Sequence, residues 1–396
     1  MTRCRVAVAL GTRPETVKLA PVIAALRQAD GFETVVVATA QHRQLLDQFL
    51  SFFNIHPDLD LNLMQDRQSL TELSCRVLTA MERALREVRP DLLLVQGDTT
   101  TVLYSALAAF YQDIPVAHVE AGLRSHDLRK PFPEEANRAL TSVLTRIHLA
   151  PTVRAREDLL RENVPPSRIV VTGNTVVDAL RSLDSRPLPL PAEIESLLEP
   201  GTRLVLVTCH RRESWGDDLR GICTGIRDLA VRFSDVRVLY AVHPNPVVQE
   251  EAARILGGAP RVHLTKALDY PTFIALLKRC HLVLTDSGGV QEEAPSFAKP
   301  VLVLRDVTER PEAAEAGMAK VIGTSPERIV EEASRLLSDP AAYRAMAGAA
   351  NPYGDGHASA RIVEVLRRWH RGESPWLPPD REFVPSGHRI FAAGAR

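Results

Sequence analysis

Hydrophobic residues occur along the chain in two alternating patterns, short apolar runs and longer amphipathic segments. The short runs are rich in Val, Ile and Leu, which is typical of strands buried on both faces of a sheet. In the first half of the chain, strands are predicted at residues 5–10, 34–39, 92–95, 115–119, 147–150 and 169–172. Helical spacing between them predicts helices at residues 16–28, 69–88, 102–111, 135–145 and 153–162. This alternation predicts parallel sheets with helices on both faces.

The same alternation starts again after a proline-rich segment. Alternating prolines in Arg186-Pro-Leu-Pro-Leu-Pro191 disfavour a helix and predict a linker. Strands are then predicted at residues 204–208, 236–241, 262–264, 282–285, 300–304 and 320–323, and helices at 218–232, 247–256, 271–279, 290–297, 326–337 and 357–370. The predicted organisation is an α/β protein with a first domain at 1–184 completed by the helix 357–370, a linker at 185–202, a second domain at 203–356 and an irregular tail at 371–396.

Composition and charge narrow the class of protein. The 396 residues are 45% hydrophobic and 24% charged, which is ordinary for a globular protein. No apolar run approaches the roughly 20 residues that span a bilayer, and the apolar stretch at residues 6–10 is too short for a signal peptide, so we expect a cytoplasmic protein with no membrane partner. A net charge of −1 argues against a nucleic acid partner. The five cysteines lack CxxC spacing, so neither a metal site nor a disulfide framework is expected.

Polar motifs follow six of the predicted strands. They are Gly11-Thr-Arg-Pro-Glu15, Gln96-Gly-Asp-Thr-Thr100 and Glu120-Ala-Gly-Leu-Arg124 in the first half, and Cys209-His-Arg-Arg-Glu-Ser214, His243-Pro-Asn245 and Asp286-Ser-Gly-Gly289 in the second. Ligands of open α/β sheets bind outside the carboxyl ends of the strands. The motifs therefore predict one site in a cleft between the two halves.

The second half carries the features of an anion site. The glycines of Asp286-Ser-Gly-Gly289 allow close backbone approach, and N–H groups at the start of the next helix favour a phosphate. Glu292 or Glu293 can accept the hydroxyls of a ribose, or each can serve only the helix dipole. Arg310 suits a diphosphate, as do Arg13 and Lys18 from the first half. Because the chain has neither a P-loop nor GxGxxG, a nucleoside diphosphate joined to another group is the best interpretation.

Acid and base candidates accompany this anion site. They are Asp98, Glu120, Glu134, Glu135 and His210. The competing interpretations are that Glu134 and Glu135 are only helix N-terminal charges and that Asp98 only caps a helix. Carboxylates facing an anion site imply removal and return of a proton on a neutral part of the substrate.

Nine motifs, in order over roughly residues 4–370, resemble the non-hydrolysing UDP-N-acetylglucosamine (UDP-GlcNAc) 2-epimerases of bacteria. They are Gly11-Thr-Arg-Pro-Glu15, Gly97-Asp-Thr-Thr100, His118-Val-Glu-Ala-Gly-Leu-Arg124, Pro133-Glu-Glu-Ala-Asn-Arg138, Val171-Thr-Gly-Asn-Thr175, His210-Arg-Arg-Glu-Ser214, Asp286-Ser-Gly-Gly-Val-Gln-Glu-Glu-Ala-Pro295, Thr308-Glu-Arg-Pro-Glu312 and Asn351-Pro-Tyr-Gly-Asp-Gly356. The resemblance implies two Rossmann-like domains facing across a cleft, the GT-B fold, in a homodimer. It also implies that no cofactor and no metal are needed.

The resemblance further implies a reaction. UDP-GlcNAc and UDP-N-acetylmannosamine (UDP-ManNAc) interconvert when the C2 proton is removed and UDP leaves C1, giving 2-acetamidoglucal. UDP then adds back and the proton returns to the other face, which supplies precursors of cell-surface polysaccharide. Two alternatives stay open: a hydrolysing relative that releases UDP and free N-acetylmannosamine, and a GT-B glycosyltransferase or non-catalytic sugar-nucleotide sensor.

Site residues follow from the matched motifs. The implied catalytic residues are Asp98, Glu120, Glu134 and His210, and the sequence leaves open which carboxylate removes the proton. The implied UDP-sugar ligands are Arg13, Lys18, Phe273, Ser287, Gly288, Gly289, Glu293 and Arg310. Residues that resemble a site for a second UDP-GlcNAc, an allosteric activator, are Gln41, His42, Gln44, Arg67, Arg211 and His243. The chain departs from the family pattern at Cys209, Arg129-Lys130 and Leu268.

Overall fold

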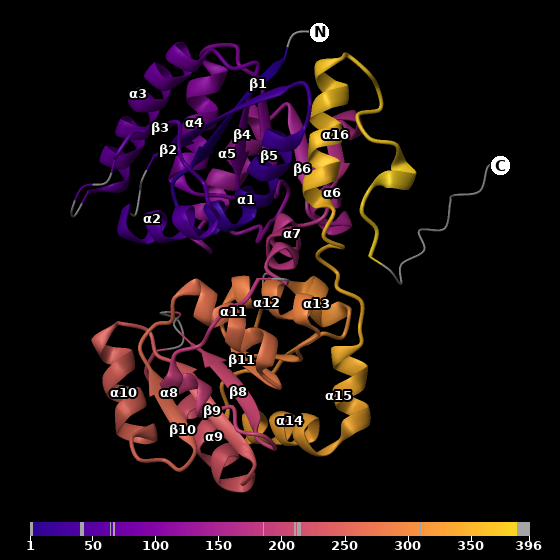
Figure 1. Ribbon diagram of the computed structural model, residues 1–396. Coiled ribbons are helices and arrows are strands. Elements are labelled where there is room, and N and C mark those ends of the chain that lie inside the picture. The colour runs from indigo at the N-terminus through magenta and orange to yellow at the C-terminus, as the bar shows by residue number, and fades with distance from the viewer. Residues whose placement is uncertain are drawn as a thin grey trace, which may run out of the picture. The chain divides into compact units, whose positions relative to one another are not determined.

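The chain divides into two compact units, each built around its own sheet (Figure 1). Unit 1 contains residues 1–183 and 353–396, and unit 2 contains residues 184–352. The computed structural model describes residues 3–39, 43–63, 65, 68–184, 186–209, 211, 215–308 and 310–385. Within these ranges, no helix is long and apolar enough to cross a membrane.

Unit 1 is built on a seven-stranded parallel sheet. In spatial order its strands are β3 (Leu59–Asp60), β2 (Phe32–Ala38), β1 (Cys4–Leu10), β4 (Leu92–Gln96), β5 (Val116–Val119), β6 (Ile147–Ala150) and β7 (Ile169–Val171). Its helices are α1 (Arg13–Gln28), α2 (Arg43–Phe52), α3 (Leu70–Val88), α4 (Thr100–Phe110), α5 (Glu134–Leu144), α6 (Val153–Arg161), α7 (Thr175–Ser182) and α16 (Ala358–His370).

Both faces of this sheet are covered. Val6 and Val8 of β1 belong to one apolar cluster, whereas Ala7 and Ala9 belong to a second cluster together with residues of α3 and α4. Successive residues of a strand point to opposite faces, so this division shows a core on each side. The continuous apolar run of β1 is therefore the pattern of a central parallel strand.

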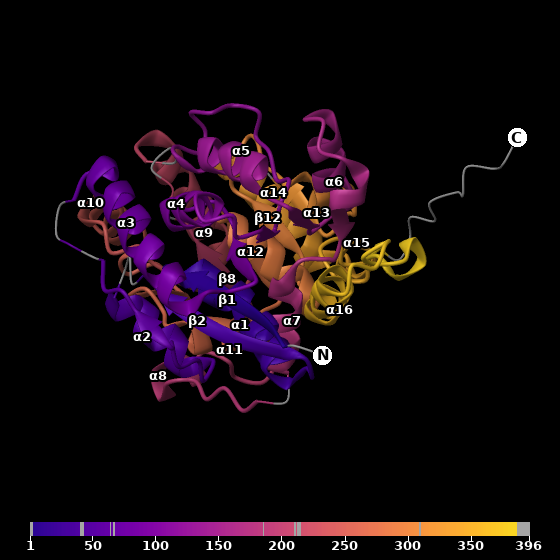
Figure 2. The same cartoon turned by 90° about the horizontal axis from the view of Figure 1, so that it is seen from above.

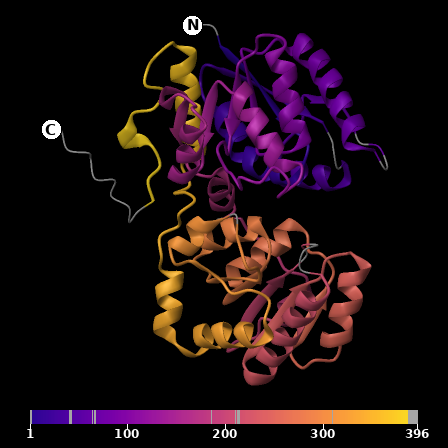
Figure 3. The same cartoon turned by 180° about the vertical axis from the view of Figure 1, so that it is seen from behind.

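The C-terminal part of the chain returns to unit 1. Helix α16 contributes Ile362 and Leu366 to the cluster beside β1, and Figure 3 shows it in yellow alongside the strands and helices of the N-terminal segment. Farther on, the Phe383 N–H donates to the Val171 carbonyl (2.9 Å) and the Glu382 carboxylate accepts from the Val171 N–H (3.2 Å). Residues 382 and 383 thus cover the outer edge of β7, which limits pairing of that edge with other chains.

Unit 2 repeats the arrangement with a six-stranded parallel sheet. In spatial order its strands are β10 (Val262–Thr265), β9 (Val236–Ala241), β8 (Arg203–Thr208), β11 (Leu282–Thr285), β12 (Val301–Val303) and β13 (Ala319–Val321). Its helices are α8 (Ala192–Glu195), α9 (Asp217–Arg232), α10 (Pro246–Leu256), α11 (Tyr270–Arg279), α12 (Gly288–Glu293), α13 (Pro311–Glu315), α14 (Pro326–Ser338) and α15 (Pro340–Ala347).

The strand order follows the same pattern in both sheets. Strand order reverses between β1 and β4 in unit 1 and between β8 and β11 in unit 2, as in Rossmann folds. The predicted class, an α/β protein with two Rossmann-like halves, is confirmed. One predicted helix was wrong in detail: residues 290–297 do not form a single α-helix, because α12 ends at Glu293 and a 3₁₀ turn follows at Ala294–Phe297. Pro295 lacks the N–H that would continue the α-helical pattern.

Candidate functional site

The predicted motifs of unit 1 lie where its strand order reverses. Ligands of this fold bind in the crevice at the reversal point, which here lies between the ends of β1 and β4. Arg13 begins α1 just after β1, the loop after β4 carries Asp98, and the next strand, β5, ends just before Glu120. Three of the six predicted motifs therefore meet at one edge of the sheet.

Glu120 has an unusual backbone conformation for its residue type. Its φ is +67°, in the left-handed region that non-glycine residues adopt at an energetic cost. Residues held in this way are concentrated at functional sites. The side chain is 8% exposed, so the carboxylate is largely removed from solvent.

Two donors from different elements contact the Glu120 carboxylate. The Lys18 ammonium, on α1, forms an ion pair with Oε2, and the Gln96 amide, at the end of β4, donates to the same oxygen over 2.7 Å. Lys18 was predicted to bind the substrate diphosphate, but in this structure it contacts a predicted catalytic acid. An ammonium and an amide N–H both favour the ionised carboxylate, which is the form that removes a proton.

Asp98 does not cap helix α4. The N-cap residue is Thr99, whose hydroxyl accepts from the Val102 N–H over 3.3 Å. The Asp98 carboxylate instead lies 3.5 Å from the Arg138 guanidinium, and the Asn137 amide donates to the Asp98 carbonyl over 2.9 Å. Capping is thus supplied by the neighbouring residue, and the loop that carries Asp98 is fixed to α5.

The two acids at the start of α5 have different surroundings. Glu135 is 2% exposed, accepts from the backbone N–H groups of Ser125 and His126 at 3.0 Å each, and pairs with Arg138 at 3.2 Å. These bonds anchor the loop after β5, which is a structural role. Glu134 is half-buried at the first position of the helix. The carboxylate to consider for chemistry is therefore Glu134.

The His118 side chain forms a hydrogen bond with the turn before Asp98. Its Nε2 lies 2.7 Å from the Gly97 carbonyl oxygen, and because a carbonyl only accepts, Nε2 carries the hydrogen. The pKa of His118 is lowered to about 4, mainly by burial and also by the charges of Arg124 and Arg138, while the Gly97 hydrogen bond opposes the shift. His118 is consequently neutral at pH 7 and acts as a donor to the backbone.

Glu15 joins two of the loops at the strand ends. One oxygen of its buried carboxylate accepts from the N–H groups of Gly11 and Thr12, and the other accepts from the Thr99 hydroxyl. Burial raises the pKa of Glu15, although these hydrogen bonds act in the opposite direction. Gly11 has no room for a side chain, because an added Cβ would lie 2.2 Å from the Thr39 hydroxyl. The loops after β1 and β4 are therefore closely packed and fixed to each other.

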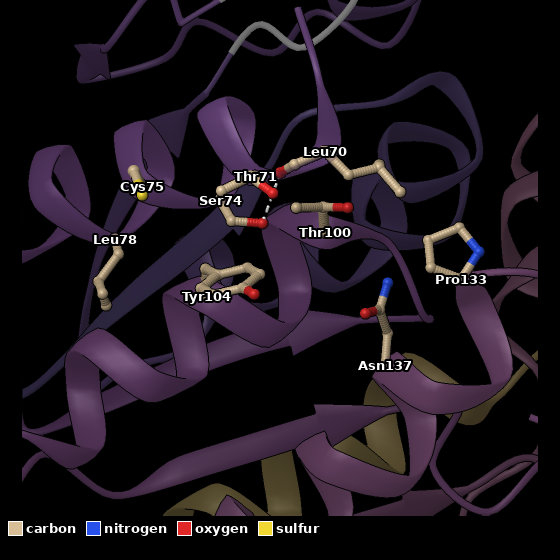
Figure 4. A pocket seen from close by; sticks show the side chains of 9 residues that line it. All are labelled: Leu70, Thr71, Ser74, Cys75, Leu78, Thr100, Tyr104, Pro133 and Asn137. Atoms are coloured by element: carbon tan, nitrogen blue, oxygen red, sulfur yellow. Dashed lines mark hydrogen bonds between the residues drawn. The ribbon is translucent and has the colours of Figure 1, made fainter.

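A pocket of about 300 Å³ opens between the first turns of α3, α4 and α5 (Figure 4). Its polar lining includes Thr100 and Asn137, and Asn137 is the residue that also donates to the Asp98 carbonyl. Its lining residues include none of the predicted catalytic residues. The pocket adjoins the loop of Asp98, and its lining residues include no Asp, Glu, His, Lys or Arg.

In unit 2 the strand order reverses between β8 and β11, and the loops after these strands are joined by Asp286. The fully buried Asp286 carboxylate accepts from the Arg211 N–H at 2.9 Å and from the Cys209 thiol at 3.2 Å. Cys209, a departure from the family pattern, is thus a donor that fixes this contact. Asp286 consequently holds the two described residues that flank His210 in the sequence.

Helix α12 begins directly after Asp286 and brings the predicted phosphate and ribose ligands together. Ser287 is its N-cap residue, followed by Gly288 and Gly289. Of the two acids, Glu292 is buried in an ion pair with the Arg310 guanidinium, whereas Glu293 is half-buried and accepts from the Tyr270 hydroxyl over 3.1 Å. Glu292 therefore positions Arg310, and Glu293 is the acid to consider for a ribose.

The other predicted ligands are spread over several elements. Phe273 is half-buried on α11, and the exposed Arg13 at the start of α1 has its guanidinium 5.5 Å from the centre of the Phe49 ring. In the predicted allosteric set, the His243 Nδ1 accepts from the Asn245 N–H over 3.2 Å. The predictions that lie outside the described residues are His210, Gln41, His42 and Arg67, and Gln44 is described only as a backbone position in α2.

Several residues with clear roles in the geometry were not predicted. They are Gln96, Asn137, Arg138 and Tyr270, which contact Glu120, Asp98 or Glu293. Three of them are polar residues at buried positions of regular elements: Gln96 ends a buried strand, and Asn137 and Arg138 lie on the buried side of α5. Buried polar residues normally have hydrogen-bond partners, so this pattern could have drawn attention to them.

The arrangement can support acid and base chemistry. Within the residues that the structure describes, no group of three or more His, Cys, Asp or Glu side chains has the geometry of a metal site. Unit 1 supplies several carboxylates at one sheet edge, one of them paired with an ammonium. Unit 2 supplies a glycine-containing turn at the start of α12 and the half-buried guanidinium of Arg310, which is ion-paired with Glu292 of the same helix.

Comparisons with known proteins agree on one family. The model of the family described as UDP-N-acetylglucosamine 2-epimerase matches residues 24–367. The chain is 51% identical over 369 residues to the UDP-N-acetylglucosamine 2-epimerase of Escherichia coli K12, covering 92% of this chain and 98% of that protein. It is 46% identical over 368 residues to the enzyme of the same name from Bacillus subtilis 168, covering 92% and 96%.

A solved structure extends this similarity to the fold. The crystal structure of UDP-GlcNAc 2-epimerase from Neisseria meningitidis bound to UDP-GlcNAc matches with a TM-score of 0.83 and 43% identity, covering 92% of this chain and 100% of that one. The match includes residues of both units, which agrees with the predicted GT-B class of two Rossmann-like domains. The chain is therefore an isomerase of the UDP-N-acetylglucosamine 2-epimerase family.

Proposed function

We propose that the chain interconverts UDP-GlcNAc and UDP-ManNAc without net hydrolysis, as a source of precursors for cell-surface polysaccharide. The observation that carries this proposal is the buried Glu120, held in a left-handed backbone conformation and contacted by Lys18 and Gln96. Such an environment stabilises an ionised carboxylate close to the strand ends where ligands of this fold bind. The relative from Neisseria meningitidis was solved with UDP-GlcNAc bound, which supports the choice of substrate.

In the proposed reaction a carboxylate takes the proton from C2 of the sugar. The electrons of the C–H bond form a C1–C2 double bond, and the C1–O bond breaks with its electron pair remaining on UDP. The products are 2-acetamidoglucal and UDP, and the reverse addition delivers a proton to the opposite face of C2. Because electrons and atoms balance within the substrate and the acids, the reaction requires no oxidant.

The proposed division of work follows the two units. In unit 1, Asp98, Glu120 and Glu134 handle the C2 proton, assisted by His210 from unit 2. In unit 2, the turn Ser287–Gly289 and Arg310 hold the diphosphate, because backbone N–H groups and a guanidinium suit phosphate oxygens. The remaining proposed contacts are Glu293 to the ribose, Phe273 to the uracil, and Arg13 and Lys18 to the diphosphate.

Proton NMR in deuterated water tests the proposal directly. UDP-GlcNAc incubated with the protein should lose its C2 proton signal as deuterium enters, and UDP-ManNAc signals should appear until equilibrium. Stoichiometric release of UDP and N-acetylmannosamine would identify a hydrolysing enzyme instead. Folded protein that binds UDP-GlcNAc but exchanges no proton would contradict the proposal and favour a transferase or a sensor.

A substitution at Glu120 sharpens the same experiment. Glu120→Gln keeps the shape and the contact with Lys18 but removes the base, so exchange should fall roughly 10²- to 10⁴-fold. Binding of UDP, measured by calorimetry, should change much less because its proposed ligands are mainly in unit 2. Full exchange activity in the folded variant would exclude Glu120 as an essential acid or base.

A second UDP-GlcNAc is proposed as an allosteric activator. The resemblance assigns it to residues that include Arg211 and His243, which follow β8 and β9. The proposal predicts sigmoidal dependence of the rate on UDP-GlcNAc, since one ligand then alters the response to another. His243→Ala should make this curve hyperbolic, whereas an unchanged sigmoidal curve in that variant would exclude this residue.

A homodimer is proposed on the resemblance and on an apolar surface of unit 1. Helices α4 and α5 pack together (Figure 2), and around them Phe110, Tyr111, Leu140 and Val143 are each more than half exposed. Exposed apolar side chains on neighbouring helices can form an interaction surface. We call these four residues the α4–α5 patch and propose a second copy of the chain as its occupant.

A further inference from the structure

One oxygen of the Glu120 carboxylate receives donors from two sides. The Lys18 ammonium comes from α1, and the Gln96 amide comes from the last residue of β4. All three side chains are largely removed from solvent, with Gln96 2% exposed and Lys18 11% exposed. Lys18 is also a proposed ligand of the diphosphate, whereas the contact of Gln96 is with Glu120.

The orientation of the Gln96 amide is fixed by chemistry. An ionised carboxylate only accepts hydrogen bonds, so the 2.7 Å contact must come from the Nε2 of Gln96. The amide Oε1 then points away from Glu120, and among the described residues this buried oxygen has no hydrogen-bond partner. Leaving a buried acceptor unpaired is unfavourable. An apolar side chain would avoid that cost, so the amide contributes through its contact with Glu120.

The backbone around Glu120 makes such a contact useful. Its φ of +67° turns the chain sharply after β5, while the Glu120 N–H donates to the Leu149 carbonyl over 3.0 Å. The direction of the side chain therefore departs from the alternation of the strand. A carboxylate in this position is oriented by the groups that bind it. Gln96 is the last residue of the neighbouring strand β4 and is paired with Val119 of β5, so its own position is fixed by the sheet.

We infer that Gln96 is a positioning residue for Glu120: its Nε2–H, together with the Lys18 ammonium, holds Oε2 in one orientation and favours the ionised carboxylate. This inference rests on the proposed function, because it assigns Glu120 a part in moving the C2 proton. Gln96 itself does not touch the substrate in this assignment. Its effect should therefore appear in the chemical step more than in substrate binding.

The test uses the full chain and the deuterium exchange of UDP-GlcNAc. Gln96→Met keeps the length of the side chain but removes the donor, and it should lower kcat roughly 10- to 100-fold, the effect of losing one hydrogen bond to a charged group. KM should change by less than about threefold, since binding contacts are retained. Gln96→His, which restores an N–H donor, should recover most of the lost kcat.

Gln112→Met is the matched control. The Gln112 amide is half-buried in the same unit and donates to the Glu82 and Ala108 carbonyls, so its loss tests the effect of removing an amide away from Glu120. This control should keep the wild-type kcat. Gln96→Glu, which has the same shape as glutamine, provides a second test if the Met variant does not fold, and it should also lower kcat because two carboxylates then face each other.

The outcomes distinguish a failure of the proposed function from a failure of the inference about Gln96. A wild-type protein that exchanges no C2 proton overturns the proposed function itself. If the wild type exchanges protons but folded Gln96→Met or Gln96→Glu keeps full kcat, only the inference about Gln96 is overturned. Equal losses in Gln112→Met, or no recovery in Gln96→His, would likewise show that Gln96 acts by general stability and not through Glu120.

Discussion

At the scale of single residues, burial and hydrogen-bond partners separate the acids that fix loops from those that serve the proposed chemistry. Glu15, Glu135 and Asp286 are buried, and each accepts a hydrogen bond from at least one backbone N–H group of a loop. The carboxylates of Glu120 and Asp98 lie near the strand ends, where they contact the cationic side chains of Lys18 and Arg138. Sequence motifs located all five acids, but pattern alone could not divide them because partners come from residues far away in the sequence.

His118 gives a prediction about stability and pH. Its pKa is lowered to about 4 by burial, so the folded state keeps it neutral while the unfolded chain binds a proton near pH 6.5. The free energy of unfolding should therefore fall as the pH drops from about 6.5 to about 4, by roughly 3 kcal/mol from this residue. His118→Gln, which retains a donor for the Gly97 carbonyl, should weaken that dependence in urea unfolding measured at pH 7 and pH 5.

Two other histidines, His148 and His56, provide references for this measurement. Burial lowers the pKa of His148 to about 3, so part of the acid sensitivity should persist in the His118 variant. His56 is exposed, and His56→Gln, which should change the free energy of unfolding by no more than about 0.5 kcal/mol, is the matched control variant. If His118→Gln loses as much stability between pH 7 and pH 5 as the wild type does, His118 is not a source of the acid sensitivity.

At the scale of elements, most strands and long helices were predicted, including the three-residue strands β7, β12 and β13, whereas β3, α8 and α15 were not. The apolar runs of β1 and β4 and the amphipathic α3 all appear near their predicted positions. Strand β3 has only two residues, and α8 only four, too few to show a period. Only Asp339 separates the end of α14 from Pro340, where α15 begins, so the pattern of α15 is hard to distinguish from a continuation of α14.

The α4–α5 patch gives a prediction at this scale. Val143 is 83% exposed, so Val143→Glu should leave the stability of the isolated chain within about 0.5 kcal/mol of the wild type. In a dimer it would place a charge in an apolar contact, which is strongly unfavourable. Light scattering coupled to gel filtration should therefore show a dimer for the wild type and a monomer for the variant.

Val231 provides the control for the patch. It is 61% exposed on α9 of unit 2, so Val231→Glu introduces the same charge on an exposed helix elsewhere. This variant should remain a dimer. A monomeric wild type would contradict the homodimer proposal, and a Val143→Glu variant that stays dimeric would place the interface away from the α4–α5 patch.

At the scale of the whole molecule, the sequence predicted two α/β halves because the strand and helix pattern starts twice. The reversal points of the two sheets coincide with the motifs that the sequence had placed after β1, β4, β8 and β11. Contacts between side chains, such as the hydrogen bond from Gln96 to Glu120, could not be predicted from the sequence, because they depend on the spatial order of the strands. Strand order follows from packing of the entire unit and is not encoded in any single segment.

Helix α16 gives a prediction about the units as folding domains. It buries Ile362, Val363, Val365 and Leu366 in unit 1, and full burial of four such side chains contributes roughly 6–12 kcal/mol. That is comparable with the whole stability of a typical domain. A fragment with residues 1–183 alone should therefore show no cooperative thermal transition, whereas a fragment with residues 184–352 should.

Mixing experiments extend this comparison. Adding a fragment with residues 353–396 to the 1–183 fragment should restore a cooperative transition in circular dichroism, because it supplies the missing core residues. A 1–183 fragment that unfolds cooperatively without this addition would show that α16 is dispensable for the core. Failure of the 184–352 fragment to fold would show that unit 2 depends on unit 1.

The return of the chain to unit 1 has a consequence for the protein during its synthesis. Unit 2 is continuous in the sequence, so all of its residues are translated before α16. Unit 1 is made first but lacks its last core helix until residue 366 and those around it emerge. While unit 2 is synthesised, unit 1 therefore lacks α16 and one apolar face of its core is uncovered. Nascent chains stalled before α16 should therefore engage chaperones through the half that was synthesised earlier.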